Sequence, residues 1–361
     1  MKTWDAIIVG AGVVGLSLGN ELSKRGMRVH LVERGEPGRE STHAAAGMLA
    51  YGDHDGHHQL DSLKLASAKI YPEFVREVED ASGMRVDFRR EGTISFFAAG
   101  GAPACSFREL TSDALAALEP AVSYIAMSGG KPGRVVLTPE ETIDNRALAQ
   151  ALLKTARHRQ IDVSTGAEAT SLIEQGGRAA GVRTSRTGLR APIVVNCAGA
   201  WAGQFAPFSL PVVPRKGHAL TVVTSNRSLL THAVRGHDVY LVPRSDGRII
   251  IGATVEDAGY DKRVDPAAIQ RLHQCAANLV PEIGELRMNE AWAGLRPATA
   301  DTLPVLGPWG LPGSFIATAH FRNGILLAPI TARVMAQLIT GEKPECSISA
   351  FSPERFAPNA A

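Results

Sequence analysis

Two hydrophobic patterns follow one another at the start of the chain. Residues 6–9 form a continuous apolar run, which is typical of a strand buried on both faces. A glycine-rich turn comes next, and leucines at helical spacing then run to Lys24, before a glycine at position 26 that is placed to end a helix. A second apolar run covers residues 28–32 and ends at Glu33. The pattern predicts a compact β-α-β unit.

Later segments alternate between helical and strand-like patterns. Residues 61–78 predict an amphipathic helix that breaks or kinks near Pro72, and residues 145–159 predict another with one apolar face. Residues 212–254 contain several short apolar runs separated by polar turns, which indicates antiparallel strands. A final helix is predicted to end before Gly341.

The composition is that of an ordinary globular chain. Of its 361 residues, 45% are apolar and 20% are charged, which argues against extensive disorder. The formal net charge of +2 offers no basic face to nucleic acid or to an anionic membrane. No apolar run approaches the roughly 20 residues that cross a bilayer. We therefore expect neither a nucleic-acid partner nor a membrane span.

Two features bear on the compartment. The four cysteines lie far apart without a C-x-x-C pair, which excludes a zinc ribbon and a disulfide framework and fits a reducing environment. Lys2 precedes an apolar stretch, as in a signal peptide, but Asp5 lies between the two and Glu21 follows without a small-residue cleavage site. We expect a cytoplasmic protein.

The strongest local motif is Gly10-x-Gly12-x-x-Gly15, between the first predicted strand and helix. Gly10 permits the tight turn, Gly12 lets a pyrophosphate approach the backbone, and Gly15 lets helix and strand pack closely. The helix N-terminus offers N–H groups to phosphates, and Glu33 is placed to bind a ribose. Together these parts indicate a dinucleotide site. FAD is favoured over NAD, because a second copy of the motif is missing and later Gly/Ala-rich turns can approach a large cofactor.

Three other patterns suggest chemistry but fit structural roles better. Gly15-x-Ser17-x-Gly19 matches a hydrolase nucleophile elbow, but Ser17 falls inside the predicted helix instead of on a turn after a strand. Residues 53–58 are rich in Asp and His, yet they lie in a polar stretch beside glycines, so a solvated loop without a metal is expected. Cys197 is expected to be a small buried residue and not a nucleophile.

Three longer segments carry a resemblance to a known family. They are Ser-Thr-His-Ala-Ala-Ala-Gly-Met-Leu at 41–49, Trp-Ala-Gly-Leu-Arg-Pro at 292–297, and His-Phe-Arg-Asn-Gly-Ile-Leu-Leu-Ala-Pro at 320–329. With them, nearly the whole chain resembles the glycine oxidase branch of the D-amino-acid oxidase superfamily, which is associated with thiamine biosynthesis.

The resemblance implies a reaction and the residues that carry it. In such flavoenzymes a hydride passes from the substrate Cα to flavin N5, the imine is hydrolysed, and O2 is reduced to H2O2. Arg296 matches the anchor for the substrate carboxylate, where a structural salt bridge is the alternative. Tyr240 matches a position over the substrate, where a core aromatic is the alternative. Arg322 and Met48 would also lie beside the substrate. No side-chain base is required, since the amine lone pair drives hydride loss.

The same resemblance implies the cofactor contacts and a non-covalent FAD. The residues expected to hold it are Gly10, Gly12, Val13, Val14, Gly15, Glu33, Arg34, Ser41, Thr42, Ala46, Gly47, Met48, Thr170, His320, Phe321, Arg322, Asn323, Gly324, Ile325 and Leu326. A helix beginning near Leu326, with Pro329 in its first turn, would point its positive end at the flavin.

Departures from the family pattern leave the substrate open. Asp238 and Val255 stand where His and Met are expected, near the substrate, so sarcosine, D-alanine or D-proline could replace glycine. Residues 215–218 are more basic than expected and are interpreted as a surface strand end. A dehydrogenase with another electron acceptor is the alternative within the class. A flavin-bound assembly or tRNA-modifying protein is the alternative outside it, against which the lack of a long basic face argues.

The expected fold is α/β, with a discontinuous Rossmann-like FAD-binding domain and an antiparallel-sheet substrate domain. We expect the first domain to comprise residues 1–85, 140–212 and 290–361, and the second to comprise residues 86–139 and 213–289. The expected partners are a small amino acid and O2, and a homo-oligomer is expected.

Overall fold

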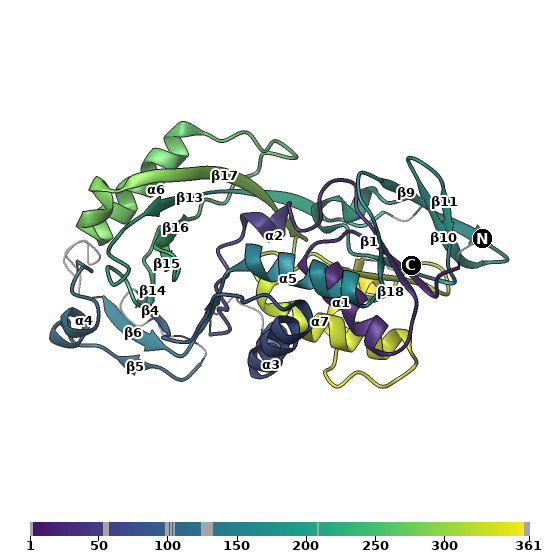
Figure 1. Ribbon diagram of the computed structural model, residues 1–361, viewed down its shortest axis with the longest axis horizontal. Helices are drawn as coiled ribbons and strands as arrows, with labels where there is room; N and C mark the ends of the chain where they lie inside the picture. The colour runs from purple at the N-terminus through teal and green to yellow at the C-terminus, as the bar shows by residue number, and fades with distance from the viewer. Residues whose placement is uncertain are drawn as a thin grey trace.

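The computed structural model describes residues 3–52, 58–97, 101, 103, 105–123, 133–207 and 209–356. Two sheets dominate the molecule. A parallel sheet with its helices occupies one half, and a large antiparallel sheet occupies the other (Figure 1). The α/β class with two kinds of sheet is therefore confirmed.

The first sheet has six strands in the order β18-β19-β12-β1-β2-β8. Their bounds are β1 Ala6–Val9, β2 Val29–Val32, β8 Asp162–Ser164, β12 Ile193–Asn196, β18 Val305–Pro308 and β19 Ser314–Thr318. All neighbours are parallel except β18 and β19. The predicted β-α-β unit is present, because α1 (Val13–Lys24) connects β1 and β2 and the chain leaves it through Gly26 at φ +80°.

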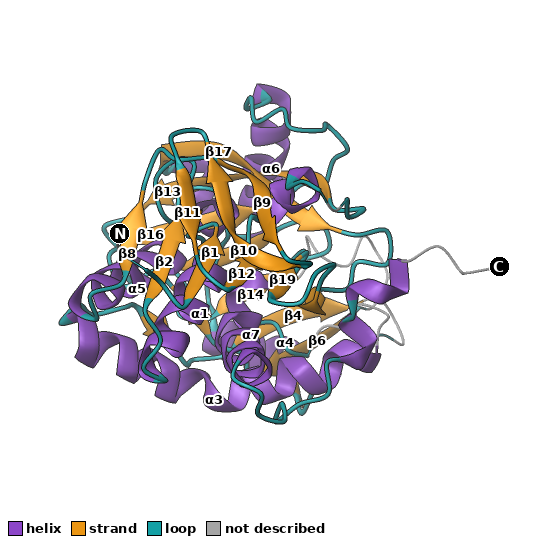
Figure 2. Cartoon of the chain, turned by 90° about the vertical axis from the view of Figure 1, so that its right-hand side faces the viewer, coloured by secondary structure: helices purple, strands orange, loops and turns teal. Residues whose placement is uncertain are grey.

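Both faces of this sheet are covered, which explains why its strands are apolar throughout. Helices α1, α3 (His58–Ser82), α5 (Asn145–His158) and α7 (Gly324–Ile339) pack together on one face (Figure 2). A three-stranded sheet of β9 (Ala169–Gln175), β10 (Arg178–Thr184) and β11 (Gly188–Arg190) lies on the other side. Accordingly, Ile8 of β1 belongs to the helix-side core, whereas Ile7 and Val9 belong to the opposite one.

Pro72 lies inside a continuous helix. A break or kink was expected near it in the helix over residues 61–78, and the break is absent, since α3 runs from His58 to Ser82. The proline removes one backbone donor, and the packing of α3 against both α5 and α7 stabilises the helix regardless.

The second sheet has eight strands in the order β17-β13-β16-β15-β14-β4-β6-β5. Their bounds are β4 Thr93–Phe97, β5 Arg108–Glu109, β6 Arg134–Thr138, β13 Val213–Val223, β14 Ala233–Arg235, β15 Tyr240–Pro243, β16 Arg248–Gly252 and β17 Arg287–Ala298. All neighbours are antiparallel except β14 and β4, so the antiparallel prediction for residues 212–254 is confirmed. β17 runs across the expected domain boundary at residue 290.

Short elements complete the fold. They are α2 (Ser41–Ala44), α4 (Ser112–Leu118), α6 (Pro266–Leu279), the pair β3 (Phe88–Arg89) and β7 (Thr142–Ile143), and 3₁₀ helices at Gly199–Gln204, Pro281–Glu285, Ser349–Phe351 and Pro353–Phe356. Helix α6 packs against β13 and β16. Within the described ranges, no helix combines the length and apolar character needed to cross a bilayer.

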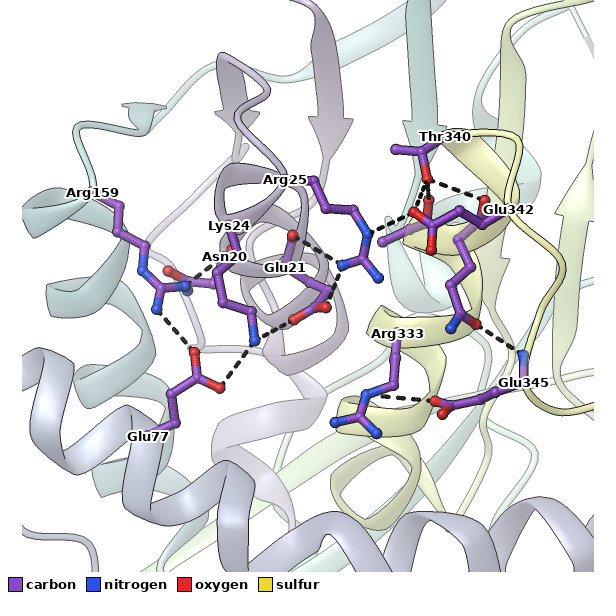
Figure 3. A network of polar contacts seen from close by, with 12 residues as sticks. Asn20, Glu21, Lys24, Arg25, Glu77, Arg159, Arg333, Thr340, Glu342 and Glu345 are labelled. Carbon is purple, nitrogen blue, oxygen red and sulfur yellow. Dashed lines mark hydrogen bonds and ion pairs between the residues drawn. The ribbon is translucent and has the colours of Figure 1, made fainter.

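The C-terminal end of α1 is held by a network of charged side chains (Figure 3). Lys24 contacts Glu21 at 2.6 Å and Glu77 of α3 at 3.0 Å. Arg159, just beyond α5, also contacts Glu77 at 3.0 Å. This network ties α1 to its neighbouring helices at the end opposite the glycine motif.

Candidate functional site

A large cavity of about 980 Å³ extends from the start of α1 to the antiparallel sheet. Its wall contains the N-terminal residues of α1 and of α7, together with residues of β14, β15 and β17. Every site residue expected from the sequence lines it except Gly15 and Leu326. A volume of this size suits an extended organic cofactor together with a small substrate.

The glycine motif shapes one end of the cavity. Gly10 has φ +99°, and a Cβ atom there would lie 2.5 Å from the carbonyl oxygen of Cys197. Gly12 lines the cavity, and a Cβ on it would meet only the Thr42 hydroxyl, at 3.3 Å. A Cβ on Gly15 would overlap the carbonyl oxygen of Gly10. Gly15 therefore serves close packing of helix on strand, which is why it does not reach the cavity.

Glu33 is fixed at the same end of the cavity. One carboxylate oxygen accepts a hydrogen bond from the Ala11 N–H and the other from the Gly35 N–H, both at 2.9 Å. Arg34 beside it lies over the Trp201 ring, with 3.5 Å between the guanidinium carbon and the ring centroid. These contacts hold an acid and a flat stacked surface at the end of β2, where a ribose and a base can be bound.

The segment 42–48 passes along the middle of the cavity with its backbone held from outside. The Thr42 hydroxyl oxygen accepts a hydrogen bond from the Val13 N–H at 2.9 Å. Four successive anchors donate to backbone carbonyls of the segment: Asn145 to Thr42 at 2.6 Å, Arg146 to His43 at 3.2 Å, Trp292 to Ala44 at 3.1 Å and Arg244 to Ala46 at 2.7 Å. Ala46, Gly47 and Met48 are thereby held at the cavity wall.

Sequence reasoning missed these anchors. Arg244 is 2% exposed, and burial lowers the pKa of its guanidinium to about 10, although the charges of Asp144 and Asp87 oppose that effect. It follows β15, about two hundred residues from its carbonyl partner in the chain. No local spacing in the sequence indicates such a contact.

At the other end of the cavity, two polar side chains lie flat on glycine backbone. A Cβ on Gly217 of β13 would overlap the guanidinium of Arg296, which donates to the Thr254 carbonyl at 3.0 Å. A Cβ on Gly252 of β16 would lie 2.5 Å from the Tyr240 hydroxyl oxygen. These glycines were the signal available in the sequence, since glycine within a strand often marks close approach of another group.

The charges at this end influence one another. Burial lowers the pKa of Arg296 below its ordinary value, Tyr240 opposes the change and the positive charge of Arg322 adds to it. Burial raises the pKa of Tyr240, although Arg296, Arg235 and Arg322 all oppose that rise. Tyr240 is therefore a neutral hydroxyl beside fixed positive charge, an arrangement suited to a carboxylate.

Two expectations concern the substrate end: that Asp238 and Val255 lie near it, and that residues 215–218 are a surface strand end. Asp238 and Val255 both line the cavity and are both exposed. The interpretation of residues 215–218 as a surface strand end is wrong, because Lys216 is 5% exposed and His218 is fully buried. Both belong to β13, which along this stretch pairs with β17 on one side, while a bridge between Lys216 and Glu256 flanks it on the other.

His218 connects several parts of this wall. Its Nδ1 lies 3.1 Å from the Thr254 hydroxyl and 3.0 Å from a Glu256 carboxylate oxygen. Its Nε2 accepts a hydrogen bond from the Asp265 N–H at 3.0 Å. The Thr254 carbonyl also accepts a hydrogen bond from the Arg296 guanidinium. This network therefore fixes the loop that the guanidinium contacts.

The start of α7 differs from the expected one. The helix begins at Gly324, so Pro329 lies inside it and not in its first turn, and Leu326 packs in the core. Pro329 cannot donate to the Ile325 carbonyl, and the buried Tyr71 hydroxyl of α3 donates to that oxygen at 3.0 Å instead. A neighbouring helix thus supplies the donor that the proline lacks.

His320 is a buried residue of the cavity wall. It is 3% exposed, its Nε2 lies 3.0 Å from the Thr331 hydroxyl, and burial lowers its pKa to about 4. The imidazole is therefore neutral at neutral pH. No catalytic histidine was expected, and a neutral ring packed on α7 fits a structural role.

The rival patterns can be placed as well. Ser17 lies inside α1 at 3% exposure, which rules out a nucleophile elbow. Cys197 is buried, and burial raises the pKa of its thiol. Residues 53–57 lie outside the described residues, and His58 begins α3. In the described ranges, no three His, Cys, Asp or Glu side chains gather in a way that could hold a metal ion.

Known proteins resemble the chain over nearly its whole length. The bifunctional protein ThiO/ThiG of Trichormus variabilis is 36% identical across 98% of this chain, which spans only 55% of that relative. The glycine oxidase of Pseudomonas aeruginosa is 31% identical, with 96% of this chain and 98% of that protein covered. The crystal structure of glycine oxidase from Geobacillus kaustophilus matches with a TM-score of 0.91 at 28% identity, covering 99% and 100% of the two chains.

The family model described as "DAO: FAD dependent oxidoreductase" matches residues 5–338. The cavity fits FAD on three grounds: the open backbone at Gly12, the helix N-terminus beside it, and the fixed carboxylate of Glu33 at the end of β2. The chain belongs to the DAO family of FAD-dependent oxidoreductases.

Proposed function

We propose that the protein is an FAD-dependent oxidase of glycine or another small amino acid. The observation that carries the proposal is the pair Arg296 and Tyr240 at the end of a cavity whose other end is a dinucleotide site. For glycine the reaction is glycine + O2 + H2O → glyoxylate + NH3 + H2O2, with an imine hydrolysed on the way. The similarity to glycine oxidases over almost the full chain supports this substrate class.

The residues of the cavity wall would hold FAD without a covalent bond. The α1 N-terminus with Gly12 and Val13 would take the pyrophosphate, Glu33 the ribose, and segment 46–48 with Gly324 the ring system. When bound, FAD supplies the two-electron acceptor that passes electrons to O2. The N-terminus of α7 gives the ring end of the cavity a fixed positive dipole, which favours negative charge there.

The protein's own part is binding and orientation. Arg296 presents a planar fork to the substrate carboxylate, and Tyr240 adds a hydroxyl donor. The surrounding positive charge of Arg296 and Arg322 favours a neutral over a protonated amine. A neutral amine keeps its lone pair for the oxidation, so no side-chain base is needed.

We also propose a role in thiamine biosynthesis, in which the imine formed from glycine is consumed. Its support is the similarity to bifunctional ThiO/ThiG proteins, of which this chain covers about half. A cytoplasmic homo-oligomer remains our prediction.

A second candidate is a sarcosine or D-amino-acid oxidase, or a dehydrogenase that uses an acceptor other than O2. The observation favouring it is the exposed pair Asp238 and Val255 in the cavity wall, where the glycine oxidase pattern has His and Met. Both side chains change the volume and charge that a substrate meets.

The test is oxygen consumption by the purified yellow protein with glycine, paired with flavin absorbance under anaerobic conditions. Oxygen uptake with stoichiometric H2O2 is the expected result. Bleaching of the flavin without oxygen uptake would identify a dehydrogenase. A flavin that no small amino acid or N-substituted glycine bleaches would contradict the proposed function.

A further inference from the structure

The substrate end of the cavity carries more positive charge than one carboxylate requires. Arg235, Arg296 and Arg322 line the cavity there, and all three charges act on Tyr240. Among the described lining residues, Asp238 is the acid at this end; it lies in the turn between β14 and β15, and its carboxylate is 2.7 Å from His237. The other lining acids come from residues 33–40 and 168, at the glycine-motif end. Arg34 and Arg39 accompany these acids and pair with Glu40 and Glu36. The charges at the glycine-motif end are thus of both signs, whereas arginines predominate at the substrate end.

The placement of Arg235 follows from strand register. Arg235 on β14 is paired directly with Tyr240 on β15 in an antiparallel ladder, so the two side chains leave the same face of the sheet. That face also carries Val242 and Ile250, which pack with Ala46 of the cavity segment. Arg235 therefore faces the cavity, and its charge acts on the Tyr240 hydroxyl.

Three polar groups consequently form a row across the sheet. The guanidinium of Arg296 reaches over β13 to the Thr254 carbonyl, Tyr240 lies over β16, and Arg235 stands one strand beyond Tyr240. Neighbouring strands are about 4.8 Å apart. A carboxylate bound between Arg296 and Tyr240 thus has a second cation within reach along the row.

We infer, on the basis of the oxidase function proposed above, that the preferred substrate is an amine with two carboxylates three or four bonds apart, the second bound by Arg235. A guanidinium has five N–H donors. Arg235 can therefore donate hydrogen bonds to this carboxylate and keep its contacts within the protein. The second carboxylate can lie on the nitrogen substituent, as in iminodiacetate, or on the side chain, as in aspartate.

Both versions balance as two-electron oxidations. Iminodiacetate + O2 + H2O gives glyoxylate + glycine + H2O2, with cleavage of a C–N bond after imine hydrolysis. Aspartate + O2 + H2O gives oxaloacetate + NH3 + H2O2. In each, the Cα–H bond breaks, the substrate is oxidised to the imine, and O2 takes up both electrons.

The experiment compares substrates that differ by one carboxylate. In the wild-type holoenzyme, kcat/KM is measured for iminodiacetate against sarcosine, and for D-aspartate against D-alanine. A preference of about tenfold or more for the diacid in one pair is expected, since a charge-assisted contact at a desolvated site has that magnitude. The pair that shows it tells whether the second carboxylate lies on nitrogen or on the side chain.

Variants then assign the preference to a residue. Arg235→Gln is expected to lower the diacid-to-monoacid ratio of kcat/KM at least tenfold. Arg263→Gln is the matched control: it removes an exposed arginine that lies outside the cavity wall and pairs with Asp261 at 3.0 Å, so the ratio should stay unchanged.

A binding readout separates recognition from turnover. Succinate and propionate, which are not oxidised, are titrated into the oxidised holoenzyme while the flavin absorbance is followed. Succinate should bind at least tenfold more tightly, and Arg235→Gln should remove the difference. Retained flavin and a normal far-UV spectrum exclude misfolding as the cause.

Two results would overturn the inference. If glycine or sarcosine bleaches the flavin anaerobically but neither diacid is preferred, the inference is wrong and the proposed function stands. If no amine in the series bleaches the flavin, the proposed function fails and the inference fails with it.

Discussion

The two ends of the cavity are built from different parts of the chain. At the glycine-motif end, much of the wall comes from about the first forty residues, and residues 168–170 and 197–204 complete it. At the substrate end, the polar side chains of Arg296, Tyr240 and Arg235 come from three strands of another sheet. Phosphate recognition needs N–H groups and open space, which a short motif supplies. Substrate recognition needs specific side chains, which only the folded sheet brings together.

The largest effect is expected at the side-chain end. Arg296→Met removes the fork that faces the substrate carboxylate and should lower kcat/KM for the preferred amino acid about 10³-fold, equivalent to about 4 kcal/mol. The loss should appear mainly as a rise in KM, with kcat changed less. Bound flavin per protein, read from the 450 nm to 280 nm absorbance ratio, should not change.

Arg263→Gln serves here too as a control for the loss of one positive charge. Equal losses in both variants, or loss of flavin from Arg296→Met, would show that Arg296 supports the fold instead of the substrate.

The next effect is the pH dependence of stability that His320 in the cavity wall should cause. His320 has a pKa of about 4 in the folded protein and an ordinary value near 6.5 in the unfolded chain. The unfolded state therefore binds more protons between these values, so stability falls as pH decreases from 6.5 to 4. At about 1.4 kcal/mol per pKa unit, the loss is about 3 kcal/mol.

Urea unfolding of wild type and His320→Asn at pH 7, 5.5 and 4 measures this effect. The variant should lose less stability across the window. Burial and nearby arginines also lower the pKa of His43 to about 4. Because His43 is present in both proteins, its contribution to the pH dependence cancels in the comparison. Parallel pH curves would show that His320 is not the group responsible.

At the backbone end, Gly12→Val is expected to weaken FAD binding about 30-fold, or about 2 kcal/mol. A Cβ at this position meets only the flexible Thr42 hydroxyl within the protein, so the fold should be retained while the added methyl groups occupy the phosphate space. Fluorescence titration of apoprotein with FAD measures the change. Gly15→Ala is the contrasting variant. Its Cβ would overlap the Gly10 carbonyl, so it should lower the thermal stability of the apoprotein.

This contrast explains what could be predicted from the sequence. The β-α-β unit and the roles of Gly10 and Gly15 follow from local spacing and hold in the structure. Arg296, Tyr240 and Arg322 were found only through a family resemblance, because nothing local links residues on separate strands. Arg235 and Arg244 were missed, since β14–β15 register places the first and a contact far along the chain defines the second.

Burial of the basic stretch 215–218 could not be anticipated for a similar reason. Its charged residues indicate a surface, but β17 pairs with the stretch on one side and Glu256 bridges to Lys216 on the other. Glu256 and Thr254 are hydrogen-bond partners of His218. The position of a strand within its sheet is decided by the tertiary fold and not by its own composition.

The smallest effect is expected where α3 supports α7. Tyr71→Phe removes the hydroxyl that donates to the Ile325 carbonyl at 3.0 Å, and Pro329 cannot replace it. A buried carbonyl without a donor costs about 1–2 kcal/mol, so urea unfolding should show a loss of that size. Ser67→Ala is the matched control, because Ser67 donates at 2.5 Å to the Leu326 carbonyl, to which the N–H of Ile330 is available one turn later. Tyr71→Phe should therefore destabilise the protein more than Ser67→Ala. Equal losses would mean that Ile325 finds another donor within α7, and that the proline is accommodated by the helix alone.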